Sequence, residues 1–390
     1  MNQQMTSEQV ELVSLVRSFC EREIDPHVSE WDRSEHFPVE VFRRLSDIGI
    51  LGLPLPEEYG GGGGSFLDYV LAIEELARHD AGMACACSVH VSAHARSLLE
   101  MGTAEQKARY LPKLARGEWI GAFALTEPHC GSDAAALRTR AERQGNGWIL
   151  NGVKQWITNA QSAGLFLLFA RTAMGTTGAS GITAFLVEGN CAGLTVDRQT
   201  HKLGVRTSET FDLVLNNCQV PDAAVLGTEG EGFKIAMWAL DGGRISIAAQ
   251  AIGIAQAALD AAKRFAKERE AFGQLIAKFQ AIQWKIAQMA TRIEAARMLT
   301  YRAAWLKDRG LPHSAEGAMA KLLASRVACE AASESVQIHG GYGYTEEFPV
   351  ERYYRDAKVT EIYEGTSEIQ KIVISRALLG PKHERVLATC

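Results

Sequence analysis

Apolar side chains in the first third of the chain recur at the spacing of amphipathic helices. In the first such segment, Val10, Val13, Val16 and Phe19 fall on one face of a 3.6-residue period. The same spacing returns in three later segments, residues 41–48, 67–78 and 89–99, and prolines mark several of the breaks between helices. We therefore expect an N-terminal α-helical domain over residues 1–121.

From about Ile120 the pattern changes from helical spacing to the two-residue alternation of strands. Glycine and asparagine turn signals follow the first two predicted strands. The predicted strands cover residues 137–142, 147–150, 165–171, 182–188, 194–197 and 210–215. They predict a middle β domain over residues 122–232, with the size of a small barrel or sandwich.

Every long segment after Phe233 is alanine-rich and helical in spacing. The predicted helices cover residues 245–269, 282–307, 315–339 and 367–379. Long helices with short connections predict an antiparallel four-helix bundle over residues 233–390. The fold class is therefore α+β and multidomain, in the order α, β, α. The glycine fingerprint of a dinucleotide-binding Rossmann domain is missing from the sequence.

Composition narrows the class of protein further. With 47% apolar and 22% charged residues, the chain matches an ordinary globular protein. Its 41 basic and 46 acidic residues form no basic block, so we expect no nucleic-acid partner. No apolar run has the length of a membrane span, and the polar start is unlike a secretory signal. We expect a cytoplasmic protein, although a mature organelle-matrix protein has the same features.

The cysteines and histidines give no sign of a metal site. Eight cysteines are scattered through the chain, mostly among apolar residues, which predicts reduced core thiols. His90 and His94 stand at helical i, i+4 spacing, but no third ligand accompanies them. A core or surface histidine pair is the favoured interpretation, and we expect no bound metal.

A carboxylate near the C-terminus is the first candidate for chemistry. Glu364 stands between Tyr363 and Gly365, just before an apolar-periodic helix. A carboxylate there can take a proton, while backbone N–H groups face the charge that develops. The simpler alternative is a first-turn glutamate that complements the helix dipole. This segment alone does not decide between them.

Two segments of the β domain could hold a flat, polar cofactor. The loop from Leu125 to Asp133 offers hydroxyls, Gly131 and backbone amides, although an ordinary surface loop has the same composition. In the later segment Trp156 and Thr158 point to one side of a strand. The indole could cover an aromatic ring system, but plain packing is the commoner role of such a pair.

Taken together, the motifs resemble the acyl-CoA dehydrogenase family along the whole chain. Two long signatures carry most of the resemblance, and shorter motifs fall between and after them in the family's order. The signatures are Thr126-Glu127-Pro128 to Asp133, and Gln337-Ile338-His339-Gly340-Gly341-Tyr342-Gly343-Tyr344 with Glu347, Arg352 and Asp356. The shorter motifs are Trp156-Ile157-Thr158-Asn159, Asp241-Gly242-Gly243-Arg244, Arg269-Glu270-Ala271-Phe272-Gly273 and Tyr363-Glu364-Gly365-Thr366-Ser367.

The resemblance implies FAD as cofactor and an acyl-CoA thioester as substrate. Glu364 matches the family's catalytic base, which removes the α-proton while a hydride leaves the β-carbon for flavin N5. Flavin contacts are implied for Phe123, Leu125, Thr126, Gly131, Ser132, Trp156, Ile157, Thr158, Thr366 and Ser367. Contacts to the adenosine diphosphate half, bound mainly by a neighbouring subunit, are implied for Arg269, Phe272, Gln280, Gln337, Gly340 and Gly341. Substrate contacts are implied for Ser132, Asp241, Arg244 and Gly365.

The resemblance also implies partners and a substrate class. The family's usual electron acceptor is electron-transferring flavoprotein, and its usual assembly is a homotetramer. The branches that act on isovaleryl and long-chain substrates carry the base at the position of Gly243, where this chain has no carboxylate. We therefore expect a short or short-branched acyl chain, in fatty acid or branched-chain amino acid catabolism. Cys130 stands where the family has a small residue, Gly, Ala, Ser or Asn, and we expect a packing change there rather than lost function.

Other functions on the same fold stay open at this point. Relatives act as flavin oxidases or enoyl-CoA reductases, and they share the flavin site. A non-catalytic acyl-CoA or flavin-binding subunit is a further class, which the intact Glu364 disfavours.

Overall fold

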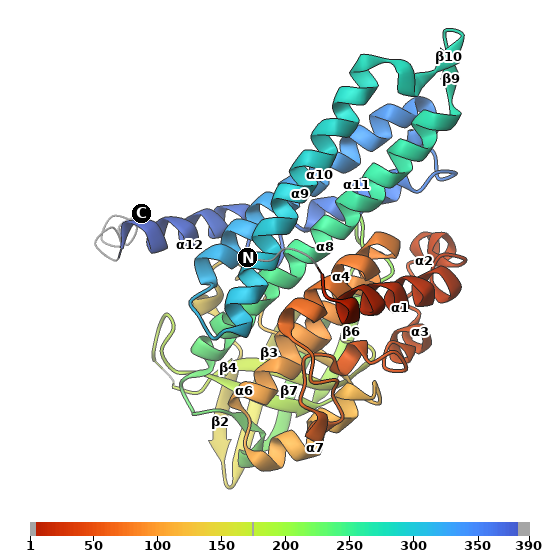
Figure 1. The fold of residues 1–390 in the computed structure, drawn as a ribbon. Helices are drawn as coiled ribbons and strands as arrows, with labels where there is room; N and C mark the ends of the chain where they lie inside the picture. Colours follow the sequence, from red (N-terminus) through yellow and green to blue (C-terminus); the bar gives the residue numbers. More distant parts are fainter. Residues whose placement is uncertain (1–4, 174, 381–390) are drawn as a thin grey trace.

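The computed structural model describes residues 5–173 and 175–380. Helices of the N-terminal part lie beside a β-sheet, and a long helical bundle extends away from both (Figure 1). The predicted order of helical, β and helical regions is confirmed. The last ten residues of the predicted bundle domain, including Cys390, lie outside the described residues.

The N-terminal region is helical, as predicted. Its helices are α1 (Ser7–Glu23), α2 (Val28–Ser34), α3 (Val39–Arg44), α4 (Phe66–His79), α5 (Ala81–Ser88), α6 (Arg96–Met101) and α7 (Ala104–Ala115). A π-helical stretch at Val89–Ala95 joins α5 to α6. Helix α4 begins at a capping box formed by Ser65 and Asp68, and most of its residues are buried. It is therefore a central helix of this region rather than a surface helix.

The middle region forms one eight-stranded sheet. Its strands are β1 (Ile120–Ala124), β2 (Arg140–Gln144), β3 (Gly147–Thr158), β4 (Ala163–Arg171), β5 (Ile182–Glu188), β6 (Leu194–Gln199), β7 (Thr210–Pro221) and β8 (Val225–Leu226). The order is β6-β7-β3-β2-β4-β5-β8, and β1 pairs in parallel with β4. Strand β3 runs eight residues beyond the predicted end at Leu150. The turn predicted at Asn151-Gly152 is therefore wrong, and Trp156 and Thr158 lie further along the same strand.

Three long helices dominate the C-terminal region. They are α8 (Gly232–Glu268), α9 (Gln280–Asp308) and α10 (Ser314–His339), followed by the shorter α11 (Val350–Val359) and α12 (Ser367–Leu379). Two short strands, β9 (Glu270–Ala271) and β10 (Gln274–Leu275), pair at the far tip of the bundle (Figure 1). The short connection between α11 and α12 contains the predicted Glu364 turn.

Helix α8 is the axis of the C-terminal region, and it packs against α4, α9 and α10. Close packing depends in part on Gly253, where a Cβ atom would lie 2.4 Å from the Glu74 carbonyl oxygen. By length and composition α8 could cross a membrane, but 83% of its most apolar window is buried inside the protein. The helix begins at Gly232, earlier than the predicted start near residue 245. Asp241, Gly242 and Gly243 are poor helix formers, which hides the helical pattern there.

Candidate active site

Glu364 lies in a turn with an unusual backbone conformation. Its φ angle is 54°, and the next residue, Gly365, has a φ angle of 91°. A residue other than glycine rarely adopts a left-handed φ, and this backbone conformation costs about 1–2 kcal/mol. Thr366 then begins α12 by accepting a hydrogen bond from the Ile369 N–H at 3.3 Å. The sequence thus carries a glutamate at a backbone position that favours glycine.

Two side chains hold the turn from inside the bundle. Lys321 Nζ donates a hydrogen bond to the Gly365 carbonyl oxygen at 2.6 Å, and Gln370 Nε2 donates to the same oxygen at 2.7 Å. The Tyr363 hydroxyl donates to Gln250 Oε1 on α8. Contacts from α8, α10 and α12 therefore fix the backbone on both sides of Glu364.

The Glu364 carboxylate lies against α8 at a glycine. A Cβ atom at Gly243 would be only 2.4 Å from Glu364 Oε2, so no larger residue leaves room for this carboxylate. Oε2 is buried and has no hydrogen-bond partner among the described residues. Burial raises the pKa of Glu364 to about 7, although the nearby charges of Lys321 and Arg244 oppose the rise. The group is an unpaired carboxylate that takes up or releases a proton near neutral pH.

The predicted substrate residues Asp241 and Arg244 lie on α8, on either side of Gly243. Arg244 Nη1 donates to Asp241 Oδ1 at 2.5 Å, and the Ser314 hydroxyl donates to the same oxygen at 2.9 Å. Arg244 is buried, and its Nε has no partner in the described part of the chain. The structure thus brings the predicted Glu364, Asp241 and Arg244 together.

A buried ion pair shapes the predicted cofactor loop. Lys154 is fully buried, and its Nζ donates to Glu127 Oε1 at 2.7 Å and to the Leu125 carbonyl at 3.1 Å. Glu127 also accepts from the N–H groups of Arg138 at 2.6 Å and Thr139 at 2.9 Å. These bonds fix the inner end of the loop against β3.

The outer end of the same loop is open to solvent. The Thr126 carbonyl accepts from the Gln155 N–H of β3 at 2.9 Å, which holds the loop beside that strand. Gly131 and Ser132 are exposed, and a Cβ atom at Gly131 would meet nothing within 4 Å. Phe123, at the start of the segment, packs on Phe169 with ring centroids 5.1 Å apart. The loop is anchored at its base and accessible at its rim.

Trp156 stands out from β3 at an irregularity of the strand. Pairing between β3 and β7 shifts register between Lys154 and Ile157, and Trp156 has a left-handed φ of 59°. The indole is 58% exposed, whereas Ile157 is buried in the sheet core. Thr158 is partly buried on the side opposite Ile157. An exposed indole beside an accessible loop fits a flat ring system.

The residues predicted for the adenosine diphosphate half are all exposed, and they lie at the other end of the molecule. Phe272 is 96% exposed in the β9–β10 turn, and the Arg269 guanidinium lies 5.4 Å from the Tyr342 ring centroid. The exposed members of this group are Arg269, Phe272, Gln280, Gln337, Gly340 and Gly341. Figure 1 shows this tip far from β3, so one chain does not bring the two predicted halves of the cofactor site together.

The remaining candidates from the sequence are cysteine and histidine side chains that packing or hydrogen bonds hold in place. Cys130 is buried, and burial raises the pKa of its thiol, as expected for a packing residue. The ligand atoms of Glu127, His129 and Cys130 lie within 4.8 Å of one another, but Lys154 and backbone N–H groups already occupy the Glu127 oxygens. His90 bridges the Gly121 N–H and the Leu114 carbonyl in the core. None of these groups is proposed as a metal site.

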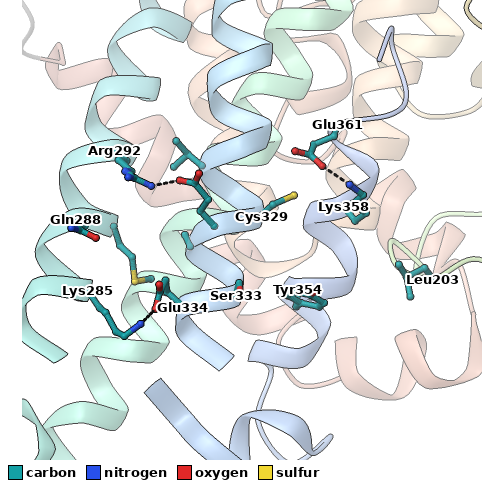
Figure 2. A pocket seen from close by; sticks show the side chains of 14 residues that line it. Leu203, Lys285, Gln288, Arg292, Cys329, Ser333, Glu334, Tyr354, Lys358 and Glu361 are labelled. Atoms are coloured by element: carbon teal, nitrogen blue, oxygen red, sulfur yellow. Dashed lines mark hydrogen bonds and ion pairs between the residues drawn. The ribbon is translucent and has the colours of Figure 1, made fainter. Parts of the chain in front are cut away.

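A separate cavity of about 590 Å³ lies among α9, α10 and α11. Figure 2 shows charged side chains across it, including the ion pairs of Lys285 with Glu334 and Lys358 with Glu361. No predicted site residue lines this cavity. It is therefore distinct from the Glu364 site.

Three family models match the chain in the order in which its domains occur. The acyl-CoA dehydrogenase N-terminal domain matches residues 6–118, the middle domain residues 122–218, and the C-terminal domain residues 230–379. The chain belongs to the acyl-CoA dehydrogenase family. It is therefore an FAD-dependent oxidoreductase by family, and the predicted three-domain fold is confirmed.

Individual relatives of the acyl-CoA dehydrogenase family are similar over nearly the whole chain. The short-chain specific acyl-CoA dehydrogenase of Clostridium acetobutylicum is 47% identical, and the match covers 95% of this chain and 98% of the relative. The acryloyl-CoA reductase (NADH) of Anaerotignum propionicum is 46% identical, with 96% and 95% covered.

Solved structures are also similar to this chain over nearly its whole length. Butyryl-CoA dehydrogenase from Megasphaera elsdenii superposes with a TM-score of 0.96 at 45% identity, covering 97% of this chain and all of that one. A chain from work on the electron transferring flavoprotein of Acidaminococcus fermentans reaches a TM-score of 0.96 at 47% identity, covering 98% and 100%. Glutaryl-CoA dehydrogenase from Mycobacterium smegmatis in complex with FADH2 reaches 0.92 at 33% identity, covering 98% and 97%.

Two features of the site were missed from the sequence. Lys321 is buried in α10 beside the Glu364 turn, and its signal in the sequence is a single lysine in the otherwise apolar segment Gly317–Ala324. In the sequence Gly243 is informative only because it is not a carboxylate, whereas in the structure its Cα lies directly against the Glu364 carboxylate. No local pattern links these positions, because three different elements bring them together.

Proposed function

We propose that this protein dehydrogenates a short acyl-CoA thioester to the trans-2-enoyl-CoA, with Glu364 as the base that removes the α-proton. The single observation that carries the proposal is the unpaired, buried Glu364 Oε2 beside Gly243, with its pKa raised by burial to about 7. A base works best when its pKa is close to the working pH. A paired or solvent-exposed glutamate lacks this property.

The backbone of the same residue can stabilise the charge that develops on the substrate. No group among residues 5–173 and 175–380 accepts the Glu364 N–H, which stands in a turn rather than in a helix. A free N–H beside the base is suited to bond a thioester oxygen as it gains negative charge. Asp241 and Arg244, on the same side of α8, are proposed to contact the thioester or the CoA chain.

The residues around β3 fit FAD. The exposed Trp156 indole offers a flat surface, and the accessible rim of the loop with Gly131 and Ser132 leaves room for phosphates and polar ring edges. Phe123, Leu125, Thr126, Ile157, Thr158, Thr366 and Ser367 are proposed to complete this half of the site. When bound there, FAD supplies the acceptor for the hydride from the β-carbon. The protein would then have to align both C–H bonds and remove the α-proton.

Complete FAD binding is proposed to need a second copy of the chain. Arg269, Phe272 and Gln280 are exposed at the tip of the bundle, as are Gln337, Gly340 and Gly341. Phe272, which is 96% exposed, offers an apolar side chain for contact with a neighbouring copy. We propose a homotetramer, and electron-transferring flavoprotein as electron acceptor, supported by the similar chain from the Acidaminococcus fermentans work. A cytoplasmic location stays a prediction.

A second candidate function is reduction of an enoyl-CoA. It is favoured by the 46% identity to the acryloyl-CoA reductase of Anaerotignum propionicum over nearly the whole of both chains. The Glu364 site serves either direction, because the group that removes an α-proton can also return it. The two functions differ in which compound the holoenzyme transforms and in the partner that supplies or accepts electrons.

Anaerobic stopped-flow spectroscopy of the FAD-loaded protein tests the proposal. Butyryl-CoA, isobutyryl-CoA, glutaryl-CoA and octanoyl-CoA are mixed in turn with oxidised enzyme, and the flavin band is followed. We expect butyryl-CoA or isobutyryl-CoA to bleach the flavin fastest. Failure of every acyl-CoA, combined with reoxidation of the reduced flavin by acryloyl-CoA or crotonyl-CoA, would favour the reductase instead.

A further inference from the structure

Lys321 is a fully buried lysine in the wall of the Glu364 site. It lies in α10 among Gly317, Ala320 and Ala324, and none of its surface is exposed. Its ammonium group forms no ion pair with a carboxylate among the described residues. The hydrogen bond to the Gly365 carbonyl at 2.6 Å is its only one in the described part of the chain. Burying an unpaired ammonium group costs several kcal/mol, so its presence needs an explanation.

Holding the Gly365 carbonyl does not by itself explain a charged side chain. Gln370 already donates to the same oxygen at 2.7 Å, and a neutral amide carries no such burial cost. What Lys321 adds is a positive charge beside the turn. This charge interacts with the Glu364 carboxylate, which is itself buried and unpaired.

We propose that Lys321 is a positioning residue for the catalytic base: its buried ammonium group holds the Gly365 carbonyl and supplies the positive charge that keeps the Glu364 carboxylate ionised. This inference rests on the proposed function of Glu364. Lys321 touches neither the reacting atoms nor the carboxylate directly, and it acts through the turn and through its charge.

The charges around the pair come from four elements. Lys321 on α10 is faced by Glu364, by Arg244 on α8, by Glu361 after α11 and by Glu368 on α12. Burial lowers the pKa of Lys321 to about 8, and these carboxylates oppose that effect, so the ammonium form prevails at neutral pH. Glu364 is also near Tyr69 on α4 and Cys85 on α5, and both are neutral because burial raises their pKa values above the ordinary ones.

The positive charge of Lys321 favours the ionised carboxylate, and it counters the rise in pKa that burial causes. Without that charge the pKa of Glu364 rises further above about 7. Less base is then ionised at neutral pH, and the acid limb of the rate profile moves to higher pH.

The test compares two substitutions that each remove one hydrogen bond to the same carbonyl. Lys321→Met removes the bond and the charge, whereas Gln370→Met removes the bond, together with a longer one of 3.4 Å to the Glu364 carbonyl, but no charge. The rate of anaerobic flavin reduction by saturating butyryl-CoA is measured against pH in each FAD-loaded variant. We expect Lys321→Met to raise the midpoint by about 1–3 pH units, the range for loss of a nearby opposite charge. Gln370→Met slows the reaction with its midpoint unchanged, and Lys321→Arg keeps the wild-type midpoint.

A second readout does not depend on turnover. The Glu364 carboxyl band is isolated by subtracting the infrared spectrum of Glu364→Gln, and its titration gives the same shift in Lys321→Met. If Lys321→Met does not fold, Lys321→Gln keeps a donor without the charge and is expected to raise the midpoint equally.

Failure of the role proposed for Lys321 and failure of the proposed function give different results. An unchanged midpoint in the charge-free variants, or an equal shift in Gln370→Met, would overturn the role of Lys321 alone. Flavin bleaching at the wild-type rate by Glu364→Gln would overturn the proposed function itself.

Discussion

Two glutamates with buried carboxylate oxygens each lie near a fully buried lysine, and their pKa values shift in opposite directions. Glu127 bonds Lys154 directly and also accepts from two backbone N–H groups. Burial alone would raise its pKa, but Lys154 and these bonds outweigh burial and lower it. Glu364 has no direct bond to Lys321, and its pKa rises to about 7. Direct pairing makes one site structural, whereas separation leaves the other available for proton transfer.

The lysines differ in the same way. Lys154 donates hydrogen bonds to Glu127 and to the Leu125 carbonyl, and so fixes the inner end of the loop from Leu125 to Asp133. Lys321 donates to a backbone carbonyl and leaves the Glu364 carboxylate free. In both cases burial of the ammonium group is costly, and the arrangement of acceptors decides whether the result is rigidity or reactivity.

The largest expected difference is between Glu364→Gln and Glu127→Gln. Glu364→Gln removes the proposed base with little change of shape, so we expect flavin bleaching by butyryl-CoA to slow by several orders of magnitude while FAD and substrate still bind. Glu127→Gln leaves the base in place and reduces the rate per bound flavin far less. Stopped-flow rates normalised to flavin content measure both. Similar rates for the two variants would remove the distinction between the sites.

Lys154→Met tests the structural half of the comparison. It leaves the Glu127 carboxylate buried without its counter-ion, which costs roughly 3–5 kcal/mol of folding free energy. Thermal unfolding of the FAD-saturated protein measures the loss. The double variant Lys154→Met with Glu127→Gln should recover part of it, because no buried charge is then left unpaired. A single variant as stable as the wild type would show that the pair is not structural.

Gly243→Ala tests the space that Glu364 needs. The added Cβ atom would lie 2.4 Å from Glu364 Oε2, so the carboxylate must move. A displacement of about 1 Å lowers the rate of flavin reduction by up to roughly 100-fold. The neighbouring Gly242→Ala is the matched control, since its Cβ atom would meet only Ser92 and Lys307 side-chain atoms at 3.3–3.4 Å. If both variants react at the same rate, the carboxylate does not occupy the observed position.

Much of the fold is visible in the sequence, because local periodicity determines it. Residues 315–339 predict α10 to within one residue of Ser314–His339, and residues 182–188 match β5. The start of α8 was missed because Asp241, Gly242 and Gly243 weaken the local pattern, and packing against α4 and α10 maintains the helix there. Tertiary contacts decide the structure where propensity is weak.

The site, like the fold, can be predicted from the sequence only in part. Glu364 stands out as a carboxylate in a turn, and the motif around it matches the family, so it could be predicted. Its φ of 54°, the shift of strand register at Trp156, and the placement of Lys321 and Gly243 beside the base could not. Each of these depends on elements far apart in the chain, which no local pattern records.

Exchange of the C2 hydrogens of a bound acyl-CoA with solvent deuterium tests the base without requiring hydride transfer to finish. The FAD-loaded enzyme is incubated with butyryl-CoA in deuterium oxide without an electron acceptor, and deuterium at C2 is followed by mass spectrometry. The wild type and Glu127→Gln are expected to incorporate deuterium, and Glu364→Gln is expected to incorporate none above the rate in buffer. Exchange by Glu364→Gln at the wild-type rate would contradict the assignment of Glu364 as the base.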